Sequence, residues 1–259
     1  MNELKNKNKV LSATNKNKPL NYISLFSGAG IGCYGFKMNG FECIATNELL
    51  TKRLNVQIAN KKCRYKTGYL AGDIAEPTIK TRLFQEIEKW EVKHNIKEVD
   101  IIIATPPCQG MSVANHKKKN ESGRNSLVVQ SLKIIHEVQP KLFILENVRT
   151  FLNTNCQDSD SKEKTIGEAI NFNLGGNYNI LFQVLNFKNY GANSSRTRTL
   201  VIGVRKDIEN ISPYDLFPQE QEPKTLRELI GDLPSLTKMG EISNDIYHAY
   251  REFNVKMLP

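Results

Sequence analysis

The chain has 259 residues, enough for one large α/β domain with its own core or for one domain with appendages. Its formal net charge of +9 favours a polyanionic partner such as nucleic acid. Five cysteines without a Cys-x-x-Cys pair argue against a disulfide framework and a structural zinc site, so we expect no metal. No apolar run approaches the length of a membrane span, and the polar amino terminus is not a signal peptide. We therefore expect a cytoplasmic protein.

Residues 1–20 form a basic, polar tail rich in Asn and Lys. Such a segment is interpreted as solvated and disordered rather than as a binding patch. Without it the remaining chain is still mildly basic.

Apolar runs beyond the tail alternate with amphipathic ones. Strands are predicted at residues 22–26, 41–46, just before Gly72, 99–105, 142–146, 178–185 and 199–204. Helices are predicted at residues 33–38, 79–93, 126–137 and 225–230. This alternation predicts a doubly wound, mostly parallel sheet with a Rossmann-like arrangement, here over residues 21–206. Residues 207–259 are interrupted by prolines and are predicted to form a separate segment.

A glycine-rich turn directly follows the first predicted strand. Gly28, Gly30 and Gly32 permit positive φ and close approach of a ligand, although a plain tight turn would explain them equally well. Glu48 ends the second strand, about 20 residues further on, where such folds bind ribose hydroxyls. Asp73 could hold an adenine amine near the third strand, or could simply be a turn or helix-cap aspartate.

The same loop lacks the Gly-Lys-Ser/Thr signature of a phosphate-binding loop. A cofactor with ribose and adenine but no phosphate fits better. The sequence therefore points to S-adenosylmethionine.

Two reactive side chains follow neighbouring apolar runs. Cys108 comes after Pro106-Pro107 at the end of the run at 99–104, and Glu146 ends the run at 142–145. Both ends open onto one crevice in a parallel sheet with helical crossovers. A thiolate and a carboxyl group in one crevice suit covalent attack on a pyrimidine. The alternatives are a buried inert cysteine and a glutamate in a structural ion pair.

With these pieces in order, the chain resembles the cytosine carbon-5 DNA methyltransferases between about Tyr22 and Val204. The matching segments are Leu25-Phe26-Ser27-Gly28-Ala29-Gly30, Glu48, Asp73-Ile74, Pro107-Cys108-Gln109, Glu146-Asn147-Val148, Asn189-Tyr190-Gly191 and Arg196-x-Arg198. The resemblance implies an S-adenosylmethionine-dependent methyltransferase fold. It also implies methyl transfer to carbon 5 of a flipped-out cytosine, in bacterial restriction-modification and near the nucleoid.

The resemblance also implies roles for single residues. Cys108 would be the nucleophile, and a protonated Glu146 with a raised pKa would stabilise the ring at nitrogen 3. Asn147 would buttress the loop around Cys108. Arg198 would hold the cytosine carbonyl, and Arg196 would orient Glu146 or the loop. The implied cofactor contacts are Phe26, Ser27, Gly28, Gly30, Glu48, Asp73, Ile74 and Pro107.

Residues 109–124 resemble the mobile loop that closes over the flipped base. Gln109, Ser112 and Arg124 are the expected contacts with double-stranded DNA. Three consecutive lysines at 117–119 could also reach phosphates, although a solvated lysine run is nearly as good an explanation.

Two features depart from the family's pattern. Asn193 and Ser194 replace the glutamine and the proline that usually mark the arginine motif, so we expect local tuning. Residues 207–259 are too few for a target recognition domain followed by the family's final motif. We therefore expect both in a second subunit, which would make this chain the larger half of a split enzyme. The alternatives are a tRNA cytosine-5 methyltransferase, a non-catalytic cofactor-binding subunit and an inactive truncated remnant.

Overall fold

The computed structural model describes residues 18–107 and 126–250, which form two compact units. Among these residues, the first unit holds 18–185 and 197–218, and the second holds 186–196 and 219–250. The domain boundary predicted at residue 206 stays a prediction. The tail at 1–17 and the loop from Cys108 to residue 125 lie outside the described residues.

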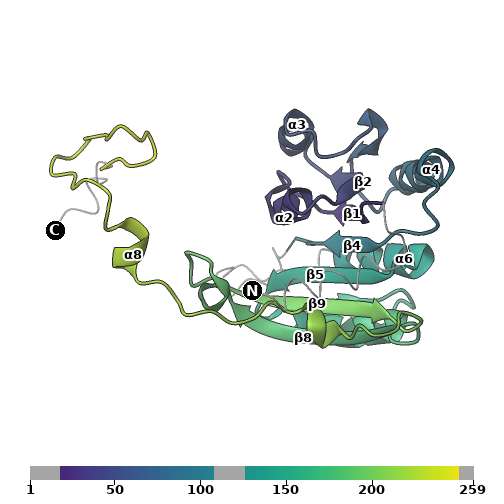
Figure 1. Cartoon of the computed structure of the whole chain (residues 1–259). Coiled ribbons are helices and arrows are strands. Elements are labelled where there is room, and N and C mark those ends of the chain that lie inside the picture. Colours follow the sequence, from purple (N-terminus) through teal and green to yellow (C-terminus); the bar gives the residue numbers. More distant parts are fainter. Residues whose placement is uncertain (1–17, 108–125, 251–259) are drawn as a thin grey trace. The chain divides into compact units, whose positions relative to one another are not determined.

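The first unit is built on a seven-stranded sheet with the strand order β3-β2-β1-β4-β5-β9-β8 (Figure 1). The strands are β1 (Asn21–Leu25), β2 (Glu42–Glu48), β3 (Tyr69–Ala71), β4 (Ile101–Ala104), β5 (Leu142–Val148), β8 (Tyr178–Asn186) and β9 (Thr197–Arg205). Strands β1 to β5 pair in parallel, and β9 runs antiparallel to β5. The chain reverses its direction of growth between β1 and β4, as in a doubly wound sheet. The predicted α/β fold is confirmed.

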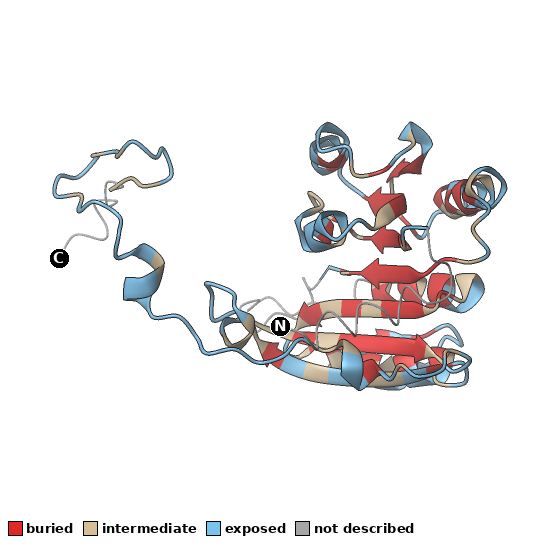
Figure 2. Cartoon of the chain, viewed as in Figure 1, coloured by how far each residue is buried: buried red, intermediate tan, exposed pale blue. Residues whose placement is uncertain are grey.

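Helices cover both faces of this sheet. Figure 1 shows α2 (Tyr34–Met38) and α3 (Thr51–Ala59) on one side, and α4 (Pro77–His94) and α6 (Leu127–Val138) on the other. Successive strand residues alternate between two cores, because side chains along a strand point to opposite faces. On β4, Ile102 and Ala104 join the larger core beneath α4 and α6, whereas Ile101 and Ile103 join the smaller one. Figure 2 shows the resulting buried centre of the sheet.

Shorter elements complete the two units. In the first they are η1 (Ile31–Cys33), η2 (Lys66–Gly68), η3 (Phe151–Asn153), the β6–β7 hairpin (Asn155–Gln157 and Glu163–Thr165), α7 (Ile166–Leu174) and η5 (Pro213–Leu216). The second contains η4 (Phe187–Tyr190), α8 (Leu226–Ile230) and a bridge between Ile242 and Ala249. Within residues 18–107 and 126–250, no helix is both long and apolar enough to cross a bilayer.

Two helices were not predicted from the sequence. Helix α3 buries only Leu54 and Gln57 and is otherwise polar or exposed, so it lacks an apolar stripe. Helix α7 did carry a signal, since its N-cap Thr165 and Glu168 form a capping box ahead of buried Ile166 and Ile170. The capping box would have located α7, whereas nothing comparable marks α3.

Close packing between β5 and β9 depends on one glycine. Gly203 lies opposite Phe143, and a Cβ at Gly203 would overlap the Phe143 ring. The Phe143 ring in turn packs edge-on against Tyr178, with centroids 5.0 Å apart. Gly203 therefore leaves the room that this buried aromatic pair occupies.

We expect Gly203→Ala to destabilise the chain by about 1–3 kcal/mol, because overpacking forces Phe143 from its position. Urea unfolding followed by circular dichroism measures the change. Gly176→Ala is the matched control, since a Cβ there meets no described atom within 4 Å. Equal unfolding midpoints for the wild type and Gly203→Ala would contradict the packing argument.

Candidate active site

The carboxyl ends of the parallel strands meet at one edge of the sheet, and side chains bond the loops there to one another. This edge carries the segments that follow β1 to β5. In open α/β sheets ligands bind in the crevice at this edge, near the point where the strand order reverses. The predicted site residues on these segments are therefore brought together by topology alone.

Glu48 joins the end of β2 to the glycine-rich turn after β1. Its Oε2 accepts the Gly28 N–H at 2.8 Å and its Oε1 accepts the Leu50 N–H at 3.0 Å. The Arg53 guanidinium lies 3.7 Å from Oε1, and Glu48 is only 5% exposed. An ionised carboxylate has about four acceptor positions, so two main-chain bonds leave capacity for ligand hydroxyls.

The glycine-rich turn has the backbone that glycine permits. Gly28 has φ of 56° and Gly30 has φ of 87°, both in the left-handed region. A Cβ at Gly28 would meet no described atom within 4 Å, so that side of the turn is open to a ligand. Phe26 also has positive φ, 54°, which is uncommon for a side chain of this size. Ser27 anchors the turn from below, because its N–H and hydroxyl both donate to the Asn47 carbonyl at 2.9 Å.

The segment that ends β3 and leads to Asp73 is held to β2 by Asn47. Its Nδ2 donates to the carbonyls of Leu70 and Gly72 at 3.1 and 3.0 Å. Asp73 Oδ1 accepts the Ala75 N–H at 2.8 Å, which is a turn bond that leaves the other carboxylate oxygen available. The Ile74 side chain is 1% exposed and packs in the larger core, so a cofactor contact by this residue falls to its main chain.

The segment leading to Cys108 is fixed from two sides. Thr105 donates from Oγ1 to the Phe26 carbonyl at 3.0 Å, which joins the ends of β4 and β1. Asn147 donates from Nδ2 to the Pro106 carbonyl at 2.9 Å, and its Oδ1 accepts the Val148 N–H. Asn147 is 3% exposed, whereas Pro107 is exposed. The backbone ahead of Cys108 is thus held by a buried bond from Asn147 on β5 and by a half-buried bond from Thr105 to the residue that follows β1.

Glu146 pairs with Arg198 across the β5–β9 ladder. Arg198 lies opposite Val148, so Glu146 is its diagonal neighbour on the same face of the sheet. The Arg198 Nε is 3.1 Å from Glu146 Oε1, and the two side chains are 16% and 28% exposed. Arg198 also donates from Nη1 to the Thr197 carbonyl at 2.7 Å. Because β9 is antiparallel, its first residues reach the edge where β5 ends.

Arg196 belongs to the second unit, where its carbonyl accepts the Phe187 N–H at 2.9 Å. The ion pair shown with Glu146 is made by Arg198. The role expected of Arg196 stays a prediction. Cys108, Gln109, Ser112 and Arg124 lie outside the described residues.

The other four cysteines are buried core side chains: Cys33, Cys43, Cys63 and Cys156. Burial raises the pKa of the Cys33 thiol, and it raises the pKa of Cys156 to about 11. Thiols with a raised pKa carry little thiolate near neutral pH. All four side chains are 6% exposed or less, so none is open to a substrate, and Cys108 stays the candidate nucleophile.

Sequence reasoning missed three polar residues beneath this edge. Gln57, fully buried on α3, bonds the glycine-rich turn, and Thr105 joins β4 to Phe26. Thr199, also fully buried, lies within 3.3 Å of the Val148 and Arg149 carbonyls that follow Glu146. Thr105 precedes Pro106 and Thr199 follows Arg198, so proximity to a motif could have found them. Gln57 has no such signal.

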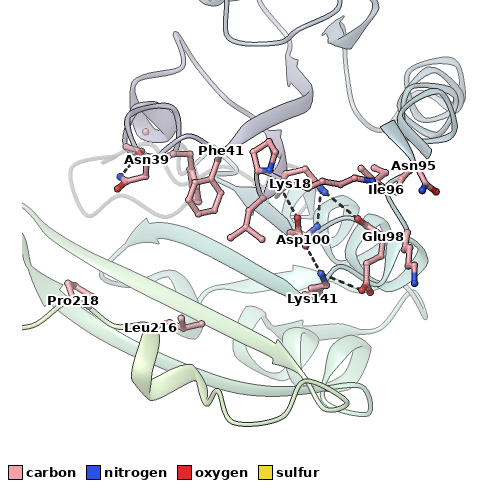
Figure 3. A pocket seen from close by; sticks show the side chains of 17 residues that line it. Lys18, Asn39, Phe41, Asn95, Ile96, Glu98, Asp100, Lys141, Leu216 and Pro218 are labelled. Carbon is pink, nitrogen blue, oxygen red and sulfur yellow. Dashed lines mark hydrogen bonds and ion pairs between the residues drawn. The ribbon is translucent and has the colours of Figure 1, made fainter. Parts of the chain in front are cut away.

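A cavity of about 1140 Å³ lies at the opposite, amino edge of the sheet (Figure 3). Its charged side chains bond one another. Asp100 accepts the Asn21 N–H at 2.8 Å and the Lys141 ammonium at 2.7 Å, and Glu98 lies 3.5 Å from Lys141. Burial lowers the pKa of Lys141, but the bond to Asp100 and both carboxylates outweigh burial, so the net shift is upward. These contacts bind β1, β4 and β5 together at their starts.

No group of three or more His, Cys, Asp or Glu side chains in the described part of the chain could hold a metal ion. The donors at the carboxyl edge are instead single carboxylates, amides and main-chain groups. They suit hydrogen bonding to an organic cofactor and to a base.

Two curated proteins that are similar to this chain are both Type II methyltransferases. The chain is 30% identical to the Type II methyltransferase M1.HgaI of Avibacterium volantium over 219 residues, covering 83% of this chain and 57% of that protein. It is 30% identical to the Type II methyltransferase M.AquIA of Picosynechococcus sp. over 232 residues, covering 83% and 89%. The chain spans about half to three fifths of the length of the first curated relatives that it matches.

Among solved structures, one of an Escherichia coli protein described as a DNA modification methyltransferase encoded within a prophage superposes with a TM-score of 0.60. The two are 26% identical, and the match covers 85% of this chain and 57% of the other. The model of the C-5 cytosine-specific DNA methylase family matches residues 20–257. This match includes the sheet, the glycine-rich turn and the Glu146–Arg198 pair. It shows that the chain belongs to the C-5 cytosine-specific DNA methylase family.

Proposed function

We propose that this chain is the catalytic part of a DNA (cytosine-5-)-methyltransferase of bacterial restriction-modification, acting in the cytoplasm on double-stranded DNA. The observation that carries the proposal is the convergence of the site at one edge. The Glu146–Arg198 pair and the Asn147–Pro106 bond lie at the ends of β4, β5 and β9, beside the glycine-rich turn. Family membership supports the same reaction.

S-adenosylmethionine is the cofactor that this family uses, and it supplies an electrophilic methyl group. The turn at Phe26 to Gly30 fits it, because Gly28 leaves open space where a side chain would otherwise stand. The Glu48 carboxylate would accept the ribose hydroxyls while keeping its bonds to Gly28 and Leu50. Asp73 and the main chain of Ile74 would lie at the adenine, and Pro107 would line the methyl end.

Cys108 would act on the target ring. Its thiolate adds to carbon 6 and forms an S–C bond, and the displaced ring electrons make carbon 5 nucleophilic. Carbon 5 would then take the methyl group from the sulfonium of S-adenosylmethionine, with its methyl–sulfur bond broken and the electron pair left on a neutral thioether. A base removes the carbon-5 proton, the S–C bond breaks, and the thiolate leaves with the aromatic ring restored. No residue stands out as this base, and we propose water for the role.

Glu146 and Arg198 would bind the ring during attack. In the structure Glu146 is an ion-pair acceptor, whereas donation to ring nitrogen 3 requires a proton on its carboxyl group. We therefore assign proton uptake by Glu146 to the entry of the base, when Arg198 can turn to the cytosine carbonyl. Asn147 would keep the backbone ahead of Cys108 in place through Pro106.

The target atom lies inside the DNA stack, so the cytosine must be flipped out. Gln109, Ser112 and Arg124 would contact the opened DNA. A tRNA cytosine is the alternative substrate, because the same ring chemistry applies to it. Parallel assays with duplex DNA and tRNA decide between these two substrates.

A second polypeptide is proposed to supply target recognition and the family's final motif. Large apolar side chains on η1 and α2 are exposed: Ile31 82%, Tyr34 58% and Met38 72%. Leu49, Val56 and Ile58, at or near α3, are 63%, 45% and 43% exposed. Figure 2 shows the exposed outer sides of both helices. We call these six residues the α2–α3 apolar surface; exposed apolar side chains in such number often mark an interface.

Cys108→Ser tests the nucleophile. DNA with 5-fluorocytosine at the target blocks proton removal, so the active enzyme should remain covalently attached to it. We expect a denaturation-resistant adduct with the wild type and none with Cys108→Ser. Cys156→Ser is the control, because Cys156 is buried in the core. An adduct of equal yield with Cys108→Ser would overturn the assignment.

Glu48→Ala should weaken S-adenosylmethionine binding about tenfold to a hundredfold, since charge-assisted hydrogen bonds contribute roughly 1.5–3 kcal/mol. Isothermal titration calorimetry measures the affinity. Glu42→Ala is the control from the other end of β2, where Glu42 pairs with Arg64 at 2.6 Å. Unchanged affinity in Glu48→Ala would remove Glu48 from the site.

Methyl transfer to plasmid DNA tests the second polypeptide. We expect little sequence-specific transfer by the 259-residue chain alone and strong transfer when the product of its genomic neighbour is added. Met38→Asp should abolish that stimulation. Val92→Asp should leave it intact, because Val92 is equally exposed, at 79%, but lies on α4 on the other face. Robust site-specific methylation by the chain alone would refute the proposal.

A further inference from the structure

A buried amide from α3 holds the glycine-rich turn in its observed shape. Gln57 is 0% exposed. Its Nε2 donates to the Gly28 carbonyl and to Ser27 Oγ, both at 2.7 Å. Its Oε1 accepts the Thr46 hydroxyl at 2.8 Å. All the hydrogen-bonding capacity of this amide except one lone pair is thus used on β2 and the turn.

The same side chain also fills the space under the turn. A Cβ at Gly30 would lie 3.0 Å from Gln57 Cγ, so the turn rests directly on the Gln57 side chain. Lys62 extends the network by donating to Thr46 Oγ1 at 3.0 Å. The open side of Gly28 faces away from this packing, since a Cβ there meets no described atom within 4 Å.

Side chains hydrogen-bond both main-chain polar groups of Gly28. Gln57 binds its carbonyl, and Glu48 binds its N–H at 2.8 Å. Its φ of 56° is a conformation that an unrestrained glycine exchanges for many others. Fixing the turn before a ligand arrives removes an ordering cost from binding. Gln57 therefore connects α3 to the conformation of the turn and to the position of the Glu48 carboxylate.

We propose that Gln57 is a positioning residue for S-adenosylmethionine, acting through the Gly28 carbonyl and Ser27 rather than by touching the cofactor. The identity of the cofactor rests on the proposed function. The effect on the turn does not, because it follows from the hydrogen bonds alone. The role requires an amide donor on Gln57, whereas a purely space-filling role would require only its volume.

Gln57→Leu removes the amide donor but keeps a side chain of similar volume, because leucine fills similar space without hydrogen bonds. We expect its dissociation constant for S-adenosylmethionine to rise about tenfold or more. With the second polypeptide present, kcat at saturating cofactor should stay within about twofold, because Cys108, Glu146 and Arg198 are untouched. Gln130→Leu is the matched control: Gln130 is a half-buried helical amide on α6, bonded to Lys80 at 2.8 Å. It should leave both quantities unchanged.

Gln57→Glu adds a pH-dependent readout. The protonated carboxyl can donate to the Gly28 carbonyl and accept from Thr46, whereas the ionised form has no donor and repels that carbonyl. Cofactor affinity of Gln57→Glu, relative to the wild type, should therefore be highest at low pH and fall as pH rises. A structural defect would give a ratio that does not change with pH.

Hydrogen–deuterium exchange of the full chain without cofactor completes the test. We expect faster exchange in the peptide covering residues 26–30 for Gln57→Leu, and wild-type exchange there for Gln130→Leu. Failure of the wild type to bind S-adenosylmethionine would overturn the proposed function and leave the exchange result to judge Gln57. Wild-type exchange and wild-type affinity in Gln57→Leu would each overturn the positioning role.

Discussion

Hydrogen bonds between buried or half-buried side chains and the main chain of neighbouring loops hold the carboxyl edge of the sheet together. Asn47 reaches from β2 to β3, Glu48 from β2 to the turn after β1, Thr105 from β4 to β1, and Asn147 from β5 to β4. An unmade bond to a buried polar group costs about 1–3 kcal/mol, so each residue strongly favours one arrangement of its loop. The crevice is therefore preformed by the sheet that underlies it.

The antiparallel strand β9 explains how an arginine far along the chain reaches this edge. A parallel strand would start at the amino edge, beside the Asp100–Lys141 pair, and would carry its first residues away from Glu146. Because β9 runs the other way, its second residue, Arg198, lies opposite Val148 and next to Glu146. The same register places Gly203 against Phe143. One strand direction thus serves both the site and the core.

The sequence was sufficient to predict the fold and most motif-bearing segments, because apolar runs mark buried strands and because strand ends in a parallel sheet share an edge. The sequence suggested that Arg196 orients Glu146 or the loop, and that role stays a prediction. The β5–β9 register that places Arg198 beside Glu146 cannot be read from spacing. Gln57 was missed for a different reason. Its role depends on α3 lying beneath the glycine-rich turn, and α3 buries one apolar side chain, Leu54, too few to show from the sequence that the polar Gln57 faces inward.

The glycine-rich turn and the α2–α3 apolar surface belong to one continuous piece of chain. Gly30, whose neighbour in space is Gln57, is the N-cap of η1, and exposed Ile31 is the first residue of that element. On α3, Gln57 points into the network while its neighbours Val56 and Ile58 are exposed. A polypeptide that docks on this surface would therefore contact η1, which follows the turn, and α3, which carries Gln57.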